Sequence, residues 1–200
     1  FEASLLIDSM LREEGVRDSV QIHFYSPAPI TLPAAGPEIS QQILNLINSE
    51  NIIFHDSCKI KSVEKNKLIF QNGEANFDLL LAIPPHVAPK VIYDSELAKE
   101  GGFIPINRDC KTQFENVYAV GDVTTLTVID TITVPKAGIF AEGEAITVAQ
   151  NIMSKIQSKT ESSLFDGKGG CFIESGRDTA SLIEVDMFSE PKPTTKLTES

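Results

Sequence analysis

A carboxylate at the end of a predicted strand is the first group in this sequence that is placed to do chemistry. Asp122 follows the apolar run Val117–Val120, which has the length and composition of a short buried strand. Gly121 stands between them and allows a sharp backbone turn that a side chain would obstruct. Because open α/β sheets place ligand contacts beyond the carboxyl ends of their strands, Asp122 is expected to accept hydrogen bonds from sugar-like hydroxyls.

A long helix, predicted after a variable loop, supplies the complementary charge. It opens at Pro135 and Lys136 and continues to Ile152. Its first turn presents free N–H groups and a partial positive charge, which can hold an electron-rich oxygen or stabilise a developing anion. Gly138 and Gly143 lower helix propensity, so they indicate a packing or cofactor constraint, with loose helix packing as the alternative.

These two stretches together carry a family resemblance. VYAVGD, followed after a loop by VPKAGIFAEGEA, closely resembles the second flavin-binding segment of the FAD-dependent pyridine nucleotide-disulfide oxidoreductase superfamily. Within it the chain looks most like the sulfide:quinone oxidoreductase and flavocytochrome c sulfide dehydrogenase branch, over nearly its whole length. The resemblance implies that Gly121 and Asp122 bind the ribityl chain of FAD. It also implies that the backbone of Lys136, Ala137 and Gly138 faces the pyrimidine edge of the isoalloxazine.

The same resemblance implies two catalytic residues, Lys136 and Cys171. Lys136 would place a cation near the flavin edge that becomes anionic on reduction. The alternatives are that its side chain contacts a quinone oxygen or is simply solvated. Cys171, in FDGKGGCFIE, matches a late strand in which the sulfide:quinone branch carries one cysteine of a redox pair. Cys58 and Cys110 sit in no matching motif, so the partner would lie outside this chain. A buried, inert thiol is the alternative for Cys171.

The first part of the chain reads as a nucleotide-binding domain without its opening strand and glycine loop. Its NAD-binding counterparts carry Asp or Glu at the end of the second strand, but here that strand ends Phe24-Tyr25-Ser26, which favours a degenerate domain that does not bind NAD. The patterns predict helices at Phe1–Glu14 and from Pro37, a hairpin turning at Lys65-Asn66, and strands at Val20–Tyr25, Asn51–Phe54, Cys58–Val63, Lys67–Phe70 and Phe77–Ile83, the last buried on both faces.

The predicted fold class is α/β: a partial two-dinucleotide-binding-domain (Rossmann-like) flavoprotein fold with a C-terminal β-hairpin. Residues 1–84 form the degenerate domain, 85–160 the returning part of the FAD domain, and 161–200 the hairpin and a frayed tail. The crossing at Pro84-Pro85 precedes His86, read as a proton relay or as a structural residue. Further strands are predicted at Phe103–Asn107 and Val117–Val120, and hairpin strands at Cys171–Glu174 and Thr179–Asp186.

Composition excludes several classes of partner. The net charge of -11 argues against binding to nucleic acid, whose phosphates would repel the chain. Three scattered cysteines do not make a secreted disulfide scaffold, and no Cys/His spacing resembles a zinc site, so no metal is expected. A cytoplasmic location is expected. Quinone reductases of the resembling branch continue into membrane-docking helices, so the resemblance leaves peripheral membrane association open for the intact protein.

The resemblance implies an FAD-dependent enzyme whose substrates are sulfide and quinone, with electrons passing from sulfide through FAD to quinone. One alternative is a type II NADH:quinone oxidoreductase of the same architecture. Another is a non-catalytic module or a fragment of a partner-binding subunit. Phe1 is not Met and lies at the start of a predicted helix, so the chain is expected to be a fragment. With no GxGxxG, it is expected to bind FAD weakly, to be inactive in isolation, and to self-associate through open edges.

Overall fold

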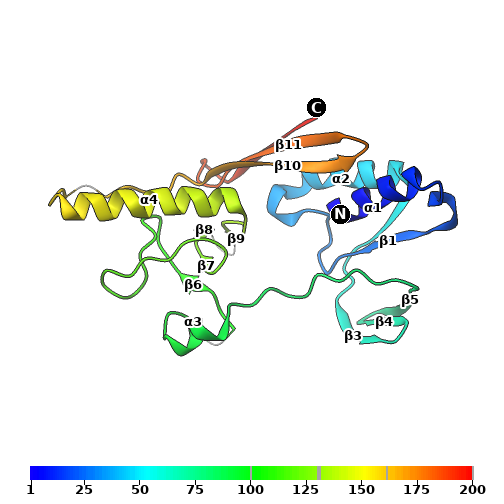
Figure 1. The fold of residues 1–200 in the computed structure, drawn as a ribbon, viewed down its shortest axis with the longest axis horizontal. Coiled ribbons are helices and arrows are strands. Elements are labelled where there is room, and N and C mark those ends of the chain that lie inside the picture. Colours follow the sequence, from blue (N-terminus) through cyan, green and yellow to red (C-terminus); the bar gives the residue numbers. More distant parts are fainter. Residues whose placement is uncertain (100, 130–131, 161, 200) are drawn as a thin grey trace. The chain divides into compact units, whose positions relative to one another are not determined.

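The chain divides into two compact units, each described by itself. The computed structural model describes residues 1–99, 101–129, 132–160 and 162–199. Unit 1 consists of residues 1–84, 172–183 and 195–200, and unit 2 of residues 85–171 and 184–194. Figure 1 traces the elements along the chain. No described helix is long and apolar enough to cross a bilayer.

Unit 1 is built around a pair of parallel strands, β1 (Ile22–Tyr25) and β2 (Ile52–His55). The helix α2 (Gly36–Ser49) connects them, as a parallel crossover requires, and α1 (Glu2–Glu13) precedes them. Both helices are amphipathic, and their apolar stripes bury side chains that form the core of this unit with β2: Leu5, Ile39, Ile43, Ile47 and Ile52. Short 3₁₀ turns lie at Arg17–Ser19 and Pro33–Ala35. The helices predicted at Phe1–Glu14 and from Pro37 and the strands predicted at Val20–Tyr25 and Asn51–Phe54 are confirmed.

A buried ion pair fastens α1 to the strands of unit 1. Arg17 donates a hydrogen bond to the buried carboxylate of Asp8. Its guanidinium also donates to the backbone oxygens of Val20 at 2.7 Å, Glu50 at 3.0 Å and Asn51 at 3.0 Å. One planar cation thereby satisfies the backbone at the entrances to both strands, which its fork of donors makes geometrically feasible.

A small antiparallel meander completes the first half of the chain. β3 (Ile60–Glu64) and β4 (Lys67–Phe70) form the predicted hairpin, in which Glu64 pairs with Lys67 across Lys65-Asn66. A third strand, β5 (Gly73–Asn76), pairs with β4 and was not predicted.

The prediction of a doubly buried strand at Phe77–Ile83 is wrong. This segment forms no regular strand, and Leu79 and Ile83 are 78% and 83% exposed. Its apolar run has the composition of a strand, but a strand exists only where neighbouring backbone pairs with it. Within the described chain the pairing partners of β1 and β2 are each other, so the run stays extended and unpaired.

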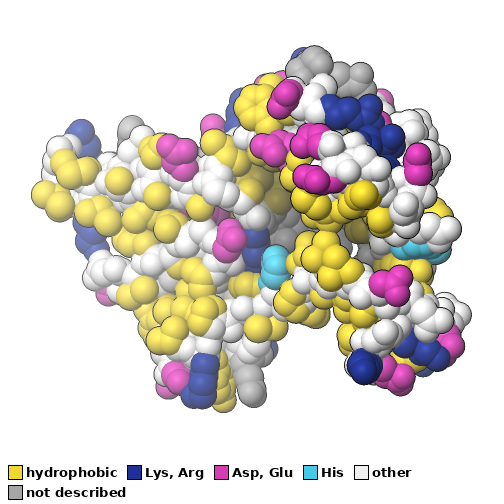
Figure 2. Space-filling view, turned by 45° about the vertical axis from the view of Figure 1, so that its right-hand side comes forward, with side chains coloured by type: hydrophobic (Ala, Val, Ile, Leu, Met, Phe, Trp, Pro, Cys, Tyr) yellow, Lys and Arg dark blue, Asp and Glu magenta, His cyan; other side chains and the backbone are white. Residues whose placement is uncertain are grey.

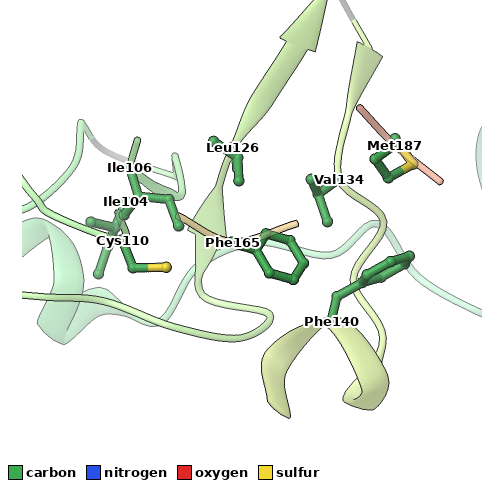
Figure 3. Close-up of a cluster of buried hydrophobic side chains, with 8 residues drawn as sticks. All are labelled: Ile104, Ile106, Cys110, Leu126, Val134, Phe140, Phe165 and Met187. Atoms are coloured by element: carbon green, nitrogen blue, oxygen red, sulfur yellow. The ribbon is translucent and has the colours of Figure 1, made fainter. Parts of the chain in front are cut away.

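Unit 2 packs short strands against one long helix. β6 (Ile104–Pro105) pairs in parallel with β7 (Thr124–Thr125), and β8 (Thr127–Ile129) pairs antiparallel with β9 (Ile132–Thr133). A short helix α3 (Lys90–Asp94) precedes them, and α4 (Gly138–Ile156) follows. Figure 3 shows the buried core of this unit, whose members are Ile104, Ile106, Cys110, Leu126, Val134, Phe140, Phe165 and Met187.

The run Val117–Val120 was predicted as a buried strand, and the structure corrects this. Tyr118 makes only an isolated antiparallel bridge to Lys111, and Val117 is 38% exposed. The chain reverses through Cys110 and Asn116, both with positive φ, so the run folds back on the preceding segment. Asp122 therefore follows an irregular segment and lies just before β7. The predicted strand Phe103–Asn107 shortens to β6.

The last part of the chain forms a three-stranded sheet in the order β10-β11-β12. β10 (Lys168–Gly176) and β11 (Thr179–Asp186) form the predicted hairpin, turning through Arg177 and Asp178, whose φ angles are 53° and 59°. β12 (Thr194–Glu199) adds a third strand where a frayed tail was predicted. The tail lacks periodicity because it gains its order from pairing with β11 and not from a buried face of its own.

Candidate functional site

The turn at Gly121 is fastened to the first turns of α4. The Gly121 N–H donates a hydrogen bond to Glu144 Oε2 at 2.6 Å. Gly121 has a φ of 80°, and a Cβ added there would lie 3.4 Å from the Cβ of Ala141. A positive φ and close approach to the helix both favour glycine, so the residue type follows from the local geometry. The turn carrying Asp122 and the start of α4 thus belong to one local arrangement.

Glu144 is a buried carboxyl that the sequence patterns did not single out. Its side chain is 2% exposed. Burial raises the pKa of Glu144, while the Gly121 hydrogen bond and the nearby Lys136 charge oppose that rise. The spacing of Glu144 along the helix is the signal in the sequence from which its burial could have been predicted. Phe140, Glu144, Thr147 and Asn151 occupy the buried stripe of α4, so a carboxyl at helical spacing from an apolar core residue marks a constrained group.

Asp122 presents its carboxylate to solvent. The residue is exposed, and no described residue donates a hydrogen bond to its side chain. Its backbone carbonyl, in contrast, accepts a bond from Lys136 Nζ at 2.7 Å. The backbone of this residue is therefore held while the carboxylate keeps its full acceptor capacity for a ligand.

The start of α4 leaves backbone donors open. The helix begins at Gly138, just after the predicted opening at Pro135 and Lys136, with Ala137 as its N-cap and without a side-chain cap. The N–H groups of Phe140 and Ala141 both donate to the Ala137 oxygen at 3.1 Å. Among the described residues no acceptor is found for the N–H groups of Gly138 and Ile139. These donors add to the positive end of the helix dipole.

Lys136 ties the turn to the residues before the helix. Its Nζ donates to the backbone oxygens of Asp122 and of Thr124, the latter at 2.6 Å, and lies 3.5 Å from the centroid of the Phe103 ring. Burial lowers the pKa of Lys136, and Asp122 and Glu144 oppose that shift. The ammonium is committed to these carbonyls in the structure, so its evident role is to position the turn.

Cys171 comes from a strand that packs on the first turn of α4. A Cβ added at Gly169 would lie 2.8 Å from Phe140 Cε1 and 3.0 Å from Ile139 Cγ2. Because strand side chains alternate between faces, Cys171 occupies the same face of β10 as Gly169, two residues further along. Cys171 is exposed. Cys171 is therefore not the buried residue of the alternative interpretation.

The other cysteines and histidines differ in their surroundings. Cys110 is fully buried, and burial raises its pKa to about 12, so this thiol is held protonated and away from solvent. Cys58 is half-buried, and burial raises its pKa as well. His86 is exposed. Among the described residues no group of three or more His, Cys, Asp or Glu side chains is arranged to hold a metal ion.

The residues around the start of α4 fit a flavin. An exposed carboxylate with unused acceptor capacity suits a polyhydroxyl chain, and open N–H groups at a positive helix end suit an electron-rich ring edge. The structure brings Gly121, Asp122, Lys136, Ala137 and Gly138 together. Cys171 lies on the strand whose Gly169 contacts the first turn of α4, two residues further along. Their functional roles stay predictions.

A family profile, described as pyridine nucleotide-disulphide oxidoreductase, matches residues 16–154. The chain belongs to this family. Its members are oxidoreductases, and FAD is the cofactor of the family and of its sulfide:quinone branch. The match spans the turn at Gly121 and most of α4, whereas Cys171 lies beyond the matched residues.

The similar proteins include sulfide:quinone oxidoreductases and a coenzyme A disulfide reductase. The chain is 26% identical over 191 residues to a mitochondrial sulfide:quinone oxidoreductase of Schizosaccharomyces pombe, covering 90% of this chain and 40% of that protein. It is 24% identical to the sulfide-quinone reductase of Aquifex aeolicus, covering 96% of this chain and 48% of that protein. A coenzyme A disulfide reductase of Staphylococcus epidermidis is 31% identical over 91 residues, covering 44% of this chain and 21% of that protein.

Solved structures confirm the fold. The sulfide:quinone oxidoreductase of Aquifex aeolicus superposes with a TM-score of 0.87 at 22% identity, over 100% of this chain and 50% of that one. A ferredoxin reductase from Rhodopseudomonas palustris gives a TM-score of 0.60 at 14% identity, over 90% of this chain and 44% of that one. The chain spans less than half the length of the two quinone-reducing relatives.

Proposed function

We propose that the whole protein is an FAD-dependent oxidoreductase that oxidises sulfide and delivers the electrons to a quinone. The observation that carries the proposal is the Gly121–Asp122 turn, fixed to the open end of α4 by Glu144 and Lys136. Similarity to sulfide:quinone oxidoreductases over 90% and 96% of the chain supports the choice of substrates. A cytoplasmic location, with the protein peripheral to a membrane, is part of the proposal because quinones are membrane-soluble.

Each residue of the site has a defined task in this proposal. The Asp122 carboxylate accepts hydrogen bonds from the ribityl hydroxyls, and the N–H groups of Gly138 and Ile139 stabilise negative charge at the pyrimidine edge. Lys136 holds the turn through two backbone carbonyls and contributes positive charge from nearby. When bound, FAD would accept two electrons from the oxidation of sulfide and pass them to the quinone.

Cys171 carries the sulfur in this proposal. It forms a disulfide with a second cysteine outside this chain, and sulfide attacks that disulfide. One S–S bond breaks and one forms, giving a persulfide on one cysteine and a thiolate on the other. Loss of one proton and two electrons from this pair would then join the two cysteines again through the added sulfur, and bound FAD would be the acceptor of those electrons. The exposed position of Cys171 is what this attack requires.

Anaerobic mixing of the FAD-loaded whole protein with sulfide or with NADH tests the proposal. Rapid bleaching of the flavin absorbance by sulfide, and reoxidation by a soluble quinone, is the expected result. Cys171→Ser should abolish bleaching by sulfide while the flavin stays bound. Cys110→Ser is the matched control, because that thiol is buried. Bleaching by NADH with no response to sulfide would overturn the proposal and favour an NADH:quinone oxidoreductase.

A further inference from the structure

Two histidines meet on the open face of the parallel sheet in unit 1. His23 lies on β1 and His55 on β2, and the register pairs His23 with Ile53 and Tyr25 with His55. The two histidines are therefore diagonal neighbours on one face of the sheet. Their ring nitrogens, Nδ1 of His23 and Nε2 of His55, are 2.9 Å apart, so one ring donates a hydrogen bond to the other.

Aromatic contacts hold this pair in place. The Tyr25 ring lies against the His55 ring with centroids 4.2 Å apart and planes 6° from parallel, and Phe70 packs against Tyr25 at 5.0 Å. His23 is exposed, so the pair can be reached from solvent. Burial, and then the neighbouring His23, lowers the pKa of His55, which favours the neutral ring that metal ions bind.

The two nitrogens lie close enough to become adjacent ligands of one metal ion once the rings turn toward it. Two imidazoles bound at the usual metal–nitrogen distance, and at a right angle about the metal, have their nitrogens about 2.9 Å apart. Right-angled nitrogen ligands are the preference of Cu²⁺ and Ni²⁺, which also head the affinity order for such ligands.

We propose that His23 and His55 form a binding site for a divalent transition-metal ion of the Cu²⁺ or Ni²⁺ type. The ion replaces the shared hydrogen bond: both rings pivot so that Nδ1 of His23 and Nε2 of His55 point to it. The ring that carried the shared proton takes it on its other nitrogen, so a neutral pair releases no proton. Water fills the remaining positions, since no third protein ligand stands within reach among the described residues. Such a site exchanges its ion readily.

This site is independent of the proposed redox function. Its residues belong to unit 1, whereas the turn at Gly121 and the start of α4 belong to unit 2. The chain contains three histidines, and the third, His86, is exposed and provides a matched control for any effect of a single imidazole.

Titration of the tag-free whole protein with Ni²⁺ tests the site, because Ni²⁺ does not oxidise thiols as Cu²⁺ does. Isothermal calorimetry should show one equivalent bound, and paramagnetic broadening should remove the imidazole NMR signals of His23 and His55 but spare those of His86. His23→Ala should weaken binding on the order of tenfold or more, whereas His86→Ala should not change it.

Two further results distinguish binding by the histidine pair from binding elsewhere on the protein. His55→Gln should weaken binding as His23→Ala does, and circular dichroism melts of both variants should show that the fold is retained. Unchanged Ni²⁺ affinity in a folded His23→Ala variant would overturn the proposal, as would broadening confined to residues beside Cys58 or Cys171, because thiols would then be the ligands. Binding only at millimolar Ni²⁺ would equally overturn it as an adventitious ion.

Discussion

The two units place different chemistry on similar frameworks. In unit 1 the parallel strands β1 and β2 end in Tyr25 and His55, and the ring stack there contains no carboxylate. In unit 2 the turn before β7 carries Asp122 beside a helix end with open N–H groups. A β-strand next to a helix start thus does not determine which ligand is bound; the side chains at that edge do.

Exposed hydrophobic side chains occur in both units, on different elements. Figure 2 shows groups of hydrophobic side chains exposed on this face of the molecule. On α4, Ile146, Met153 and Ile156 are 52%, 52% and 72% exposed. In unit 1 the exposed apolar side chains include Leu79 and Ile83 of the unpaired segment. Both units therefore carry exposed apolar side chains beside their buried cores.

The largest expected effect is confined to unit 1. Arg17→Met takes one of two guanidinium partners from the buried carboxylate of Asp8, which keeps Arg12 at 2.7 Å, and removes donors from three backbone oxygens. We expect a loss of about 2–3 kcal/mol in the free energy of unfolding, measured by urea denaturation, because buried backbone oxygens lose charged donors. Lys90→Met breaks the exposed pair with Asp94 and should cost at most about 0.5 kcal/mol. Equal losses in the two variants would contradict the role of Arg17.

The next effect concerns ligand binding by unit 2. Asp122→Asn in the whole protein should weaken FAD binding about 10- to 100-fold, because a charged acceptor is lost from the ribityl contacts. Its free energy of unfolding without FAD should stay unchanged, since no described residue uses that carboxylate as a hydrogen-bond acceptor. Glu142→Gln, on the exposed side of α4, is the control. FAD titration by fluorescence measures both, and equal affinities would refute the role of Asp122.

A smaller effect tests how closely α4 is packed. A Cβ at Gly143 would lie 2.7 Å from Cε2 of Phe165, whose ring is 1% exposed and has no space to retreat. Gly143→Ala should therefore lower the free energy of unfolding by about 1 kcal/mol, despite its gain in helix propensity. Gly138→Ala meets no atom within 4 Å and should show no loss. Thermal melts compare the two, and a stabilised Gly143→Ala would contradict this packing.

The smallest effect is a pH dependence at Glu144. Its pKa is raised in the folded protein, so its ionisation costs stability as the pH rises from the ordinary value of 4.5 through the raised one. Glu144→Gln cannot ionise but still accepts from Gly121. The free energy of unfolding of this variant, relative to the natural protein, should therefore rise between pH 4 and pH 7. Urea denaturation at both pH values measures it, and a difference that is constant with pH would exclude the buried ionisation.

Local patterns predicted much of this fold. The helices α1, α2 and α4 and the hairpin at Lys65-Asn66 follow from periodicity and turn residues within one segment. The strand predictions at Phe77–Ile83 and Val117–Val120 were wrong because an apolar run does not specify which strands will pair with it. The strand β12 was missed for the same reason.

The candidate site was predictable in part. The glycine, the carboxylate and the helix start were found from the motif at residues 121–138, and the structure places them together. The sequence could not show that Lys136 would turn back to two carbonyls, because that depends on the path of the loop between residues 122 and 136. It also did not reveal Glu144, since a glutamate in a helix usually faces solvent.

The hydrogen bond between Gly121 and Glu144 has a consequence for how a ligand would be received. The turn is joined to the second turn of α4 through Glu144 and to the residue before the helix through Lys136. The distance between the acceptor on the turn and the donors at the helix end is therefore set before anything arrives. A molecule long enough to touch both would find its two anchor points already spaced, and little ordering of the chain would oppose its association.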